Sequence, residues 1–322
     1  MKTVQGILLA AICLLGTVPA TAAEKYPSRP VRLVVPFAPG GSNDTIARYL
    51  ALHLTEVLAT SVVVENRSGA GSVVGVEIAA NAQPDGHTMV IISASFAFSS
   101  ALRSKLPFDP VKSFSPVSKM ATGPVVLAVN PSLPVKNVKE LIDLAAAKPG
   151  QLNFASAGVG SAQHLGFELL RTLVKFDVVH VPFKGGGPAT VSVIAGDSQI
   201  ALGSVISLIP HIRSGRLRPL ATGGLKRSSA LPDLPTIDES GIKGYEASNW
   251  WGILVPAGTP RYAIVRLDKE IARFLTLDRV KKRLSNDGAE PDYLSQADLA
   301  RFIAAETAKW ARVVKAAGIK PQ

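Results

Sequence analysis

Cysteine, aromatic residues and long apolar runs are all scarce in this sequence of 322 residues. Cys13 is the single cysteine, and it lies in the N-terminal apolar stretch. The rest of the chain therefore cannot form disulfides, use a thiol nucleophile or hold a metal through cysteine. After this stretch no run reaches the about 20 apolar residues that a membrane-spanning helix needs. Aromatic residues make up 6% and charged residues 18%, an ordinary globular balance.

The first 22 residues have the features of a secretory signal peptide. Met1-Lys2 is a short positive region, residues 7–15 are apolar, and Ala20-Thr21-Ala22 has the small-x-small pattern of a cleavage site. The alternative, a membrane anchor, would need a longer apolar run. Ile12 precedes Cys13, where a lipoprotein signal would have a small residue. We therefore expect cleavage near Ala22, no lipid anchor, and a periplasmic location.

Basic residues outnumber acidic ones, 35 to 24, which gives a formal charge of +11. Such a surface suits nucleic acid, an anionic membrane or an anionic solute. Export argues against nucleic acid, and the basic residues are scattered. The exception is Lys281-Lys282-Arg283, which is more typical of the solvated face of a helix than of a site. The charge thus leaves an anionic membrane surface and an anionic solute as possible partners.

Strand-like and helix-like segments alternate along the chain, which predicts an α/β fold with a mostly parallel, doubly wound sheet, or two of them. Apolar, β-branched runs occupy residues 31–35, 62–64, 89–92, 125–129, 152–155, 178–181, 200–202, 217–221 and 250–255. A length of 322 residues favours two domains. With 125–129 and 250–255 as candidate hinges, we assign residues 23–126 and 228–322 to domain 1 and residues 127–227 to domain 2.

Catalytic and cofactor motifs are missing. The sequence has no GxSxG nucleophile elbow, and its five histidines (His53, His87, His164, His180 and His211) show neither HExxH nor paired metal-ligand spacing. Residues 69–75 resemble a dinucleotide-binding loop, but the next strand ends in Ser93-Ala94-Ser95 without the acidic residue that would hold the ribose. We therefore expect no enzyme activity, no cofactor and no metal site.

Three glycine-rich turns, each between a strand and a helix, are the clearest functional signal. They are residues 36–44, 156–161 and 184–188. The first N–H groups of a helix have no partner within the helix and carry the positive end of its dipole, so such turns suit a carboxylate or phosphate. Any one turn is better explained as a connection between a strand and a helix, but three of them, in both candidate domains, favour a shared anion site. Asp44 either contacts a ligand or complements the dipole, and His164 either touches ligand or supports a helix start.

The mature chain resembles, almost from end to end, the Bug/TctC family of periplasmic solute-binding proteins of tripartite tricarboxylate transporters. The resemblance is carried by a series of motifs in a fixed order: Pro36-Phe37-Ala38-Pro39-Gly40-Gly41 with Asp44 and Ala47-Arg48, Glu65-Asn66-Arg67, Gly69-Ala70-Gly71, Pro84-Asp85-Gly86, Phe108-Asp109-Pro110-Val111, Lys148-Pro149-Gly150, Ser156-Ala157-Gly158, His164-Leu165, Val181-Pro182-Phe183-Lys184-Gly185, Pro210-His211-Ile212-Arg213-Ser214-Gly215 and Pro256-Ala257-Gly258-Thr259-Pro260.

The resemblance implies two α/β domains around a central cleft that closes on the ligand like a flytrap. It also implies that one ligand carboxylate is held mainly by backbone groups and water. Carried over motif by motif, the ligand-binding positions are Phe37, Ala38, Gly40, Gly41, Ser42, Asp44, Ser93, Ser95, Ser156, Ala157, Gly158, Gly160, Ser161, His164, Lys184, Gly185 and Gly203. The implied partners are a small organic carboxylate and the permease subunits of the transporter, and we expect a monomer.

One departure from the family pattern concerns specificity. The family commonly has aspartates before the Pro-His-Ile-Arg-Ser-Gly segment, where this chain has Gln199 and Gly203. If those positions face the cleft, the change makes it less hostile to a second carboxylate. Two other functions stay open: a sensor-type binding protein that presents its ligand to a receptor, and a secreted α/β hydrolase, for which no nucleophile and base were found.

Overall fold

The computed structural model describes residues 26–103 and 105–316, so the predicted signal peptide lies outside the described residues. Within these ranges, no helix is both long enough and apolar enough to cross a membrane. The strands are β1 (Val31–Val35), β2 (Val62–Asn66), β3 (Thr88–Ser93), β4 (Phe114–Val129), β5 (Asn153–Ser156), β6 (Val179–Pro182), β7 (Ile200–Ser204), β8 (Arg218–Thr222), β9 (Ser248–Pro256) and β10 (Glu290–Leu294).

The helices follow the strands in alternation, as the sequence predicts. They are α1 (Ser42–Leu58), a short 3-10 turn (Ala70–Ser72), α2 (Val73–Ala80), α3 (Ala94–Leu102), α4 (Val138–Ala147), α5 (Ala162–Leu173), α6 (Gly186–Ala195), α7 (Val205–Arg213), α8 (Arg261–Thr276), α9 (Asp278–Asn286) and α10 (Gln296–Ala316).

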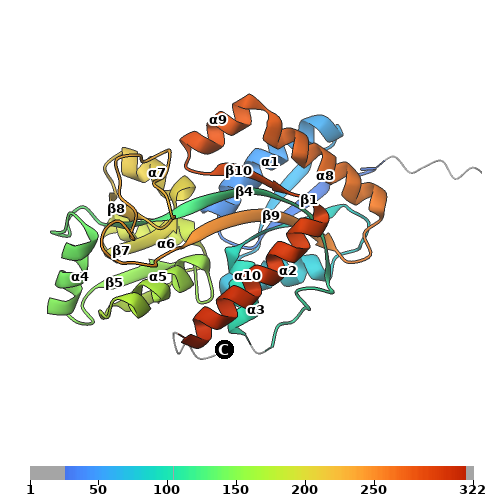
Figure 1. Cartoon of the computed structure of the whole chain (residues 1–322). Coiled ribbons are helices and arrows are strands. Elements are labelled where there is room, and N and C mark those ends of the chain that lie inside the picture. The colour runs from blue at the N-terminus through green and yellow to red at the C-terminus, as the bar shows by residue number, and fades with distance from the viewer. Residues whose placement is uncertain (1–25, 104, 317–322) are drawn as a thin grey trace, which may run out of the picture.

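The strands form two groups joined by the long strands β4 and β9, and the molecule has two lobes (Figure 1). We call lobe 1 the part with β1, β2, β3, β9, β10 and the first part of β4, with α1–α3 and α8–α10. Lobe 2 has the last part of β4, β5–β8 and α4–α7. The main sheet path runs β2-β1-β3-β9-β4-β7-β5-β6, with β8 and β10 also paired to β4.

Each lobe is a sheet covered by helices on both faces, which explains the continuous apolar strands. In lobe 1 one face packs on α1, α8 and α9, and the other packs on α2, α3 and α10. In lobe 2 the two faces pack on α4 with α5 and on α6 with α7. Val34 and Val35 are neighbours in β1 and belong to different cores, as expected where both faces of a sheet are buried.

The middle of the sheet differs from the mostly parallel arrangement that the sequence predicts. β1 is parallel to β2 and β3, and β5 is parallel to β6 and β7. The pairs β3–β9, β4–β9 and β4–β7 are antiparallel. Antiparallel β4 and β9 carry the chain between the lobes, so the parallel units are confined to the outer parts of each lobe.

The predicted domain boundary between residues 227 and 228 stays a prediction, but the core packing bears on it. Ile237, Ile242 and Tyr245 belong to the apolar core that α4 and α5 form on lobe 2. The hydroxyl of Tyr245 donates to the carbonyl of Gly166 in α5 at 3.0 Å. The chain between β8 and β9 therefore packs on lobe 2 before β9 leads it back to lobe 1.

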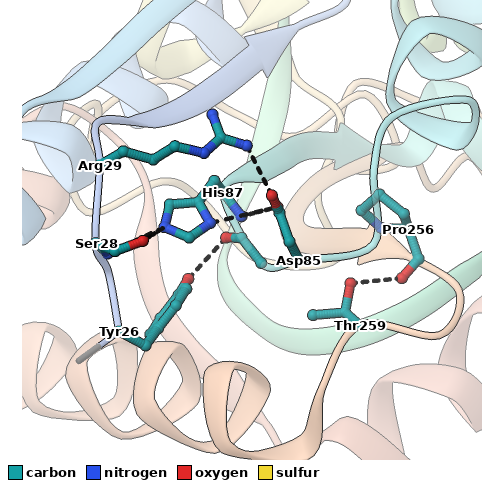
Figure 2. Close-up of polar contacts among 8 residues, drawn as sticks. Tyr26, Ser28, Arg29, Asp85, His87, Pro256 and Thr259 are labelled. Atoms are coloured by element: carbon teal, nitrogen blue, oxygen red, sulfur yellow. Dashed lines mark hydrogen bonds and ion pairs between the residues drawn. The ribbon is translucent and has the colours of Figure 1, made fainter. Parts of the chain in front are cut away.

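The Pro84-Asp85-Gly86 turn ties the first described residues to lobe 1 (Figure 2). The hydroxyl of Tyr26 donates to the carbonyl of Gly86 at 2.7 Å, and Arg29 pairs with Asp85 at 2.7 Å. The backbone N–H of Ser28 donates to Nε2 of His87 at 3.2 Å. This turn is separate from the three glycine-rich turns, and it fixes the position of the segment that leads into β1.

Candidate ligand-binding cleft

A small cavity lies where the two lobes meet. Its walls come from the start of α1, the start of α3, the turn into α5, the start of α6 and the first residues of β9. No wall residue carries a charged side chain. The wall residues are Phe37, Gly41, Ser42, Asn43, Ser93, Ser95, Ala157, Ala162, Gln163, Gly186 and Asn249.

The turn from β1 into α1 is held in shape by Asp44. Gly40 has φ of +83°, a conformation that favours glycine, and Gly41 is the N-cap residue, so α1 begins at Ser42. The Asp44 carboxylate accepts hydrogen bonds from the backbone N–H of Gly40, from Nδ2 of Asn66 and from Arg48, each at 3.0 Å. Burial raises the pKa of Asp44, but these donors together hold it below its ordinary value. The carboxylate oxygens of Asp44 thus stabilise the turn itself.

The turn from β5 into α5 is stabilised by serine and histidine side chains. Oγ of Ser156 accepts from the N–H of Gly158 at 3.1 Å and lies 2.6 Å from Nε2 of His180. Oγ of Ser161 caps α5 by accepting from the N–H of His164. Nδ1 of His164 accepts from the N–H of Gly160 at 3.3 Å. His164 therefore supports the helix start, one of the two roles that its sequence position suggested.

His164 and His180 form a stacked pair, with ring centroids 4.3 Å apart. Burial lowers the pKa of each ring to about 4, and the nearby Arg171 acts in the same direction. Both rings are therefore neutral near pH 7. In this form Nδ1 of His164 keeps the lone pair that accepts the Gly160 N–H.

Direct contacts between the lobes surround the cavity. The N–H of Ala38 in lobe 1 donates to the carbonyl of Lys184 in lobe 2 at 3.0 Å. Oγ of Ser95 in α3 accepts from the N–H of Ala162 in α5 at 3.0 Å. A Cβ placed on Gly187 would lie 2.2 Å from the carbonyl oxygen of Pro39. The lobes are thus in a closed arrangement, and glycine allows the backbones to approach.

The field in the cavity favours an anion although no wall side chain is charged. The first turns of α1, α3, α5 and α6 all reach it, and each brings the positive end of a helix dipole and N–H groups without helical partners. None of the described acidic side chains lines the cavity. Asp44, in the first turn of α1, is held by Gly40, Asn66 and Arg48. Several helix N-termini around one small space form a typical anion-binding arrangement.

Asn43 supplies a hydrogen-bond donor that the described residues leave unused. Its side chain is buried, with 4% of the residue exposed, and its Oδ1 accepts from Nε1 of Trp251 at 3.2 Å. Nδ2 has no hydrogen-bond partner in the described part of the chain. By contrast, the Asn249 side chain is engaged with Ala94, Trp250 and Ser204. An unpaired buried donor costs free energy unless a ligand or water pairs with it.

A second hollow adjoins the cavity across Phe37 and Ala157. Lys184 and Arg103 lie in its walls and bring positive charge. Nη2 of Arg103 donates to the carbonyl of Ala70 at 3.3 Å, while its Nε is buried without a partner in the described residues. The space outside the uncharged cavity is therefore cationic.

The structure places many of the predicted site residues around this cavity. Phe37, Gly41, Ser42, Ser93, Ser95 and Ala157 line it, and Gly158 and Lys184 line the adjoining hollow. Ala38, Gly40, Asp44, Ser156, Gly160, Ser161, His164 and Gly185 shape the turns or the contact between the lobes. Three polar wall residues were missed: Asn43, Gln163 and Asn249. Asn43 and Gln163 are each the second residue of a helix, a position from which the sequence could have identified them as wall residues.

The two residues that depart from the family pattern lie away from the cavity walls. Gln199 is held at the start of β7, where its Oε1 accepts from the N–H of Asn153 and its Nε2 donates to the carbonyl of Gly196. A Cβ on Gly203 would lie 3.0 Å from Leu208 in α7. An effect of Gly203 on specificity therefore stays a prediction, and it would have to act through α7.

Two α/β lobes joined by long strands, with a cavity formed by helix N-termini between them, define a solute-binding protein of the flytrap class. Comparison with known proteins identifies the family. Residues 46–319 match the family described as TctC, the tripartite tricarboxylate transporter family receptor. The chain belongs to this family, whose members are solute-binding proteins and not enzymes.

Individual relatives are similar over nearly the whole chain. Protein BugT of Bordetella pertussis is 36% identical over 322 residues, covering 99% of this chain and 98% of BugT. The periplasmic binding protein BugD has 33% identity and a TM-score of 0.90 over 92% of this chain and 100% of BugD. Rpa4515 of R. palustris, solved with adipate, has 36% identity and a TM-score of 0.90, with coverage of 92% and 100%.

Proposed function

We propose that this protein captures a small organic carboxylate in the cavity between its lobes and delivers it to the permease subunits of a tripartite transporter. The observation that carries the proposal is the meeting of four helix N-termini around an uncharged cavity, next to the unpartnered Nδ2 of Asn43. The adipate bound by the similar protein Rpa4515 supports the same class of ligand.

The geometry suggests how such a ligand is held. One carboxylate lies at the first turns of α1 and α5, where it accepts from backbone N–H groups and from Nδ2 of Asn43. The body of the ligand contacts Phe37 and Ala157. A second carboxylate, where the ligand has one, reaches toward Lys184 and Arg103 in the adjoining hollow. We therefore place linear dicarboxylates first among the candidate ligands.

The test is a thermal-shift screen of the purified mature protein against mono-, di- and tricarboxylates, each paired with its amide, followed by calorimetry. A ligand at 100 times its dissociation constant stabilises the folded protein by about 2.7 kcal/mol. Carboxylates should raise the midpoint and their amides should not. The proposal fails if no carboxylate raises the midpoint of protein that was unfolded, freed of any retained ligand and refolded.

Export to the periplasm is part of the same proposal, because the cavity then meets solutes that have entered from outside the cell. Periplasmic extraction followed by N-terminal sequencing tests it, and we expect the mature chain to begin just after Ala22. A chain that retains Met1 and stays with the cytoplasmic fraction would contradict export. Co-purification with membrane permease subunits, in the presence of ligand, tests the partner.

A further inference from the structure

The helices α1, α8 and α9 lie together on the outer side of lobe 1 (Figure 1). Residues of these three helices line a second cavity, which is away from the cleft, partly open to solvent, and has mostly apolar walls. Leu52 of α1 stands at its edge with 70% of its surface exposed, and the rings of Tyr49 and Phe274 form its sides together with Val280. None of these residues lines the cleft between the lobes.

His53 gives this cavity an unused polar group. The residue is buried, with 5% exposed, and its ring packs on Phe274 with centroids 5.2 Å apart. Within the described residues neither Nδ1 nor Nε2 has a hydrogen-bond partner. Burial lowers the pKa of His53, and Glu270 nearby acts in the opposite direction. The neutral ring offers one donor and one acceptor to a hydroxyl group.

The rim of the cavity carries two guanidinium groups, of Arg279 and Arg283, and one carboxylate, of Glu56. Arg283 lies over the Tyr49 ring, 3.9 Å from its centroid, and Tyr49 is held in turn by a 2.8 Å hydrogen bond from its hydroxyl to Asp287. Arg279 is a weakly held rim residue: its side chain is 67% exposed, and its partner Glu56, at 3.6 Å, is 71% exposed. The two guanidinium groups are in position to bind an anion at the opening.

We propose that this cavity is a second small-molecule site, which binds an aromatic hydroxy acid. The aromatic ring lies between Phe274, Val280 and the edge formed by Leu52. The carboxylate faces Arg279 and Arg283 at the rim, and the hydroxyl pairs with His53 in the interior. The site shares no residue with the cleft, so the proposal does not depend on the function proposed above.

Methyl NMR of the mature protein, titrated with 4-hydroxybenzoate, tests the proposal at residue level. Methyl groups of Leu52 and Val280 report on this cavity, and those of Ala157 and Ala162 report on the cleft, so binding at either place is seen separately. We expect saturable shifts at Leu52 and Val280. Their absence at probe concentrations up to about 1 mM would overturn the proposal, whatever the cleft methyls do.

Substitutions and a matched probe test the contacts. His53→Phe keeps the ring but removes both nitrogens, so benzoate and 4-hydroxybenzoate should bind this variant equally, whereas the wild type should prefer the hydroxylated probe about tenfold. The exposed Arg279→Glu should weaken both probes about tenfold, and Lys282→Glu, with the same charge change on an exposed residue of α9, less than twofold. Saturable shifts that are unchanged in both His53→Phe and Arg279→Glu would overturn the assignment.

Discussion

At the scale of single residues, the polar side chains near the cleft have two different roles: some hold the turns in shape, and one is in position to contact a ligand. Asp44 and His164 use their hydrogen-bonding atoms to shape the turns that approach the cavity. Asn43 differs because its Oδ1 accepts from Trp251, whereas its Nδ2 has no partner among the residues that the structure describes. The neutral Asn43 is therefore in position to contact a ligand, whereas the charged Asp44 is not.

Asn43→Asp should separate ligand binding from folding. The new carboxylate keeps an oxygen that accepts from Trp251, and an acidic residue in the first turn of α1 complements the helix dipole. It replaces the free donor with a negative charge, so a carboxylate ligand should bind at least about tenfold more weakly. Calorimetry measures the affinity and thermal unfolding measures the fold. Asn81→Asp, the same change on an exposed residue, is the control, and equal affinity in both variants would refute the role of Asn43.

The His164–His180 pair predicts a loss of stability in mild acid. Burial lowers the pKa of His164 from 6.5 to about 4, so the unfolded chain takes up a proton first. The stability that this ring contributes is complete above pH 6.5 and is lost as pH falls toward 4. For His164 alone we expect a loss of about 1–2 kcal/mol between pH 7 and 5. Urea unfolding at both pH values measures it.

His164→Phe serves as the comparison for this pH effect. Phenylalanine keeps a ring stacked on His180 but has no titrating nitrogen. The variant is less stable at pH 7, because the N–H of Gly160 loses its acceptor, but its unfolding free energy should change less between pH 7 and 5. If wild type and variant lose the same stability on acidification, the buried neutral ring is not the cause.

At the scale of elements, glycine turns bring helix starts from opposite lobes within contact. Gly187 is the second residue of α6, and the space between its Cα and the carbonyl of Pro39 admits a hydrogen atom but no side chain. Gly71 is similar, because a Cβ there would lie 2.2 Å from the carbonyl oxygen of Val159. Gly71 in the loop of residues 69–75 thus lets one lobe approach the other. Gly69 and Gly75 have a different steric reason, because they pack against Val74 and Pro36 within lobe 1.

Gly187→Val should therefore prevent closure without unfolding either lobe. The added side chain overlaps Pro39 only while the lobes touch, so opening the cleft relieves the clash. We expect binding of the ligand found in the screen to be lost, with circular dichroism unchanged. Val191→Leu enlarges the solvent-facing side of the same helix, where Val191 is 63% exposed, and should bind normally. Normal affinity in Gly187→Val would mean that this contact is not needed for binding.

At the scale of the whole molecule, β4 and β9 are the connections on which lobe movement depends. β4 pairs with β9 in lobe 1 and with β7 and β8 in lobe 2, and the change of partners begins near Val125. Hydrogen bonds between the lobes include Ala38 with Lys184, Ser95 with Ala162 and Arg213 with Asn286. Each contributes about 1 kcal/mol net and can be replaced by water when the cleft opens, so a bound ligand can shift the balance between the open and closed arrangements.

We therefore expect the ligand-free protein to open in solution and the ligand to close it. Small-angle X-ray scattering should give a larger radius of gyration without ligand and a smaller one with it. Gly187→Val should stay at the larger value in both conditions. An identical radius of gyration for the wild type with and without ligand would show that closure is not coupled to binding.

The sequence by itself determined the class of fold, the family and the three turns that approach the cleft. These features are local: an apolar strand, a glycine turn and a helix start are encoded within about ten residues, so spacing and residue type suffice to predict them. The start of α4 is encoded as locally, because the Glu140 N–H donates to Oδ1 of the N-cap residue Asn137 at 2.9 Å. The family motifs extended this local information over nearly the whole chain.

Only the tertiary structure decided the length of β4 and the identity of the wall residues. β4 begins at Phe114, well before the apolar run 125–129, because pairing with β9 holds its polar residues and prolines in the sheet. Asn43, Gln163 and Asn249 come from three distant segments and share a wall only when the lobes meet. A side chain becomes a free donor or a structural support according to the partners that reach it, and those partners are set by long-range packing that no local pattern contains.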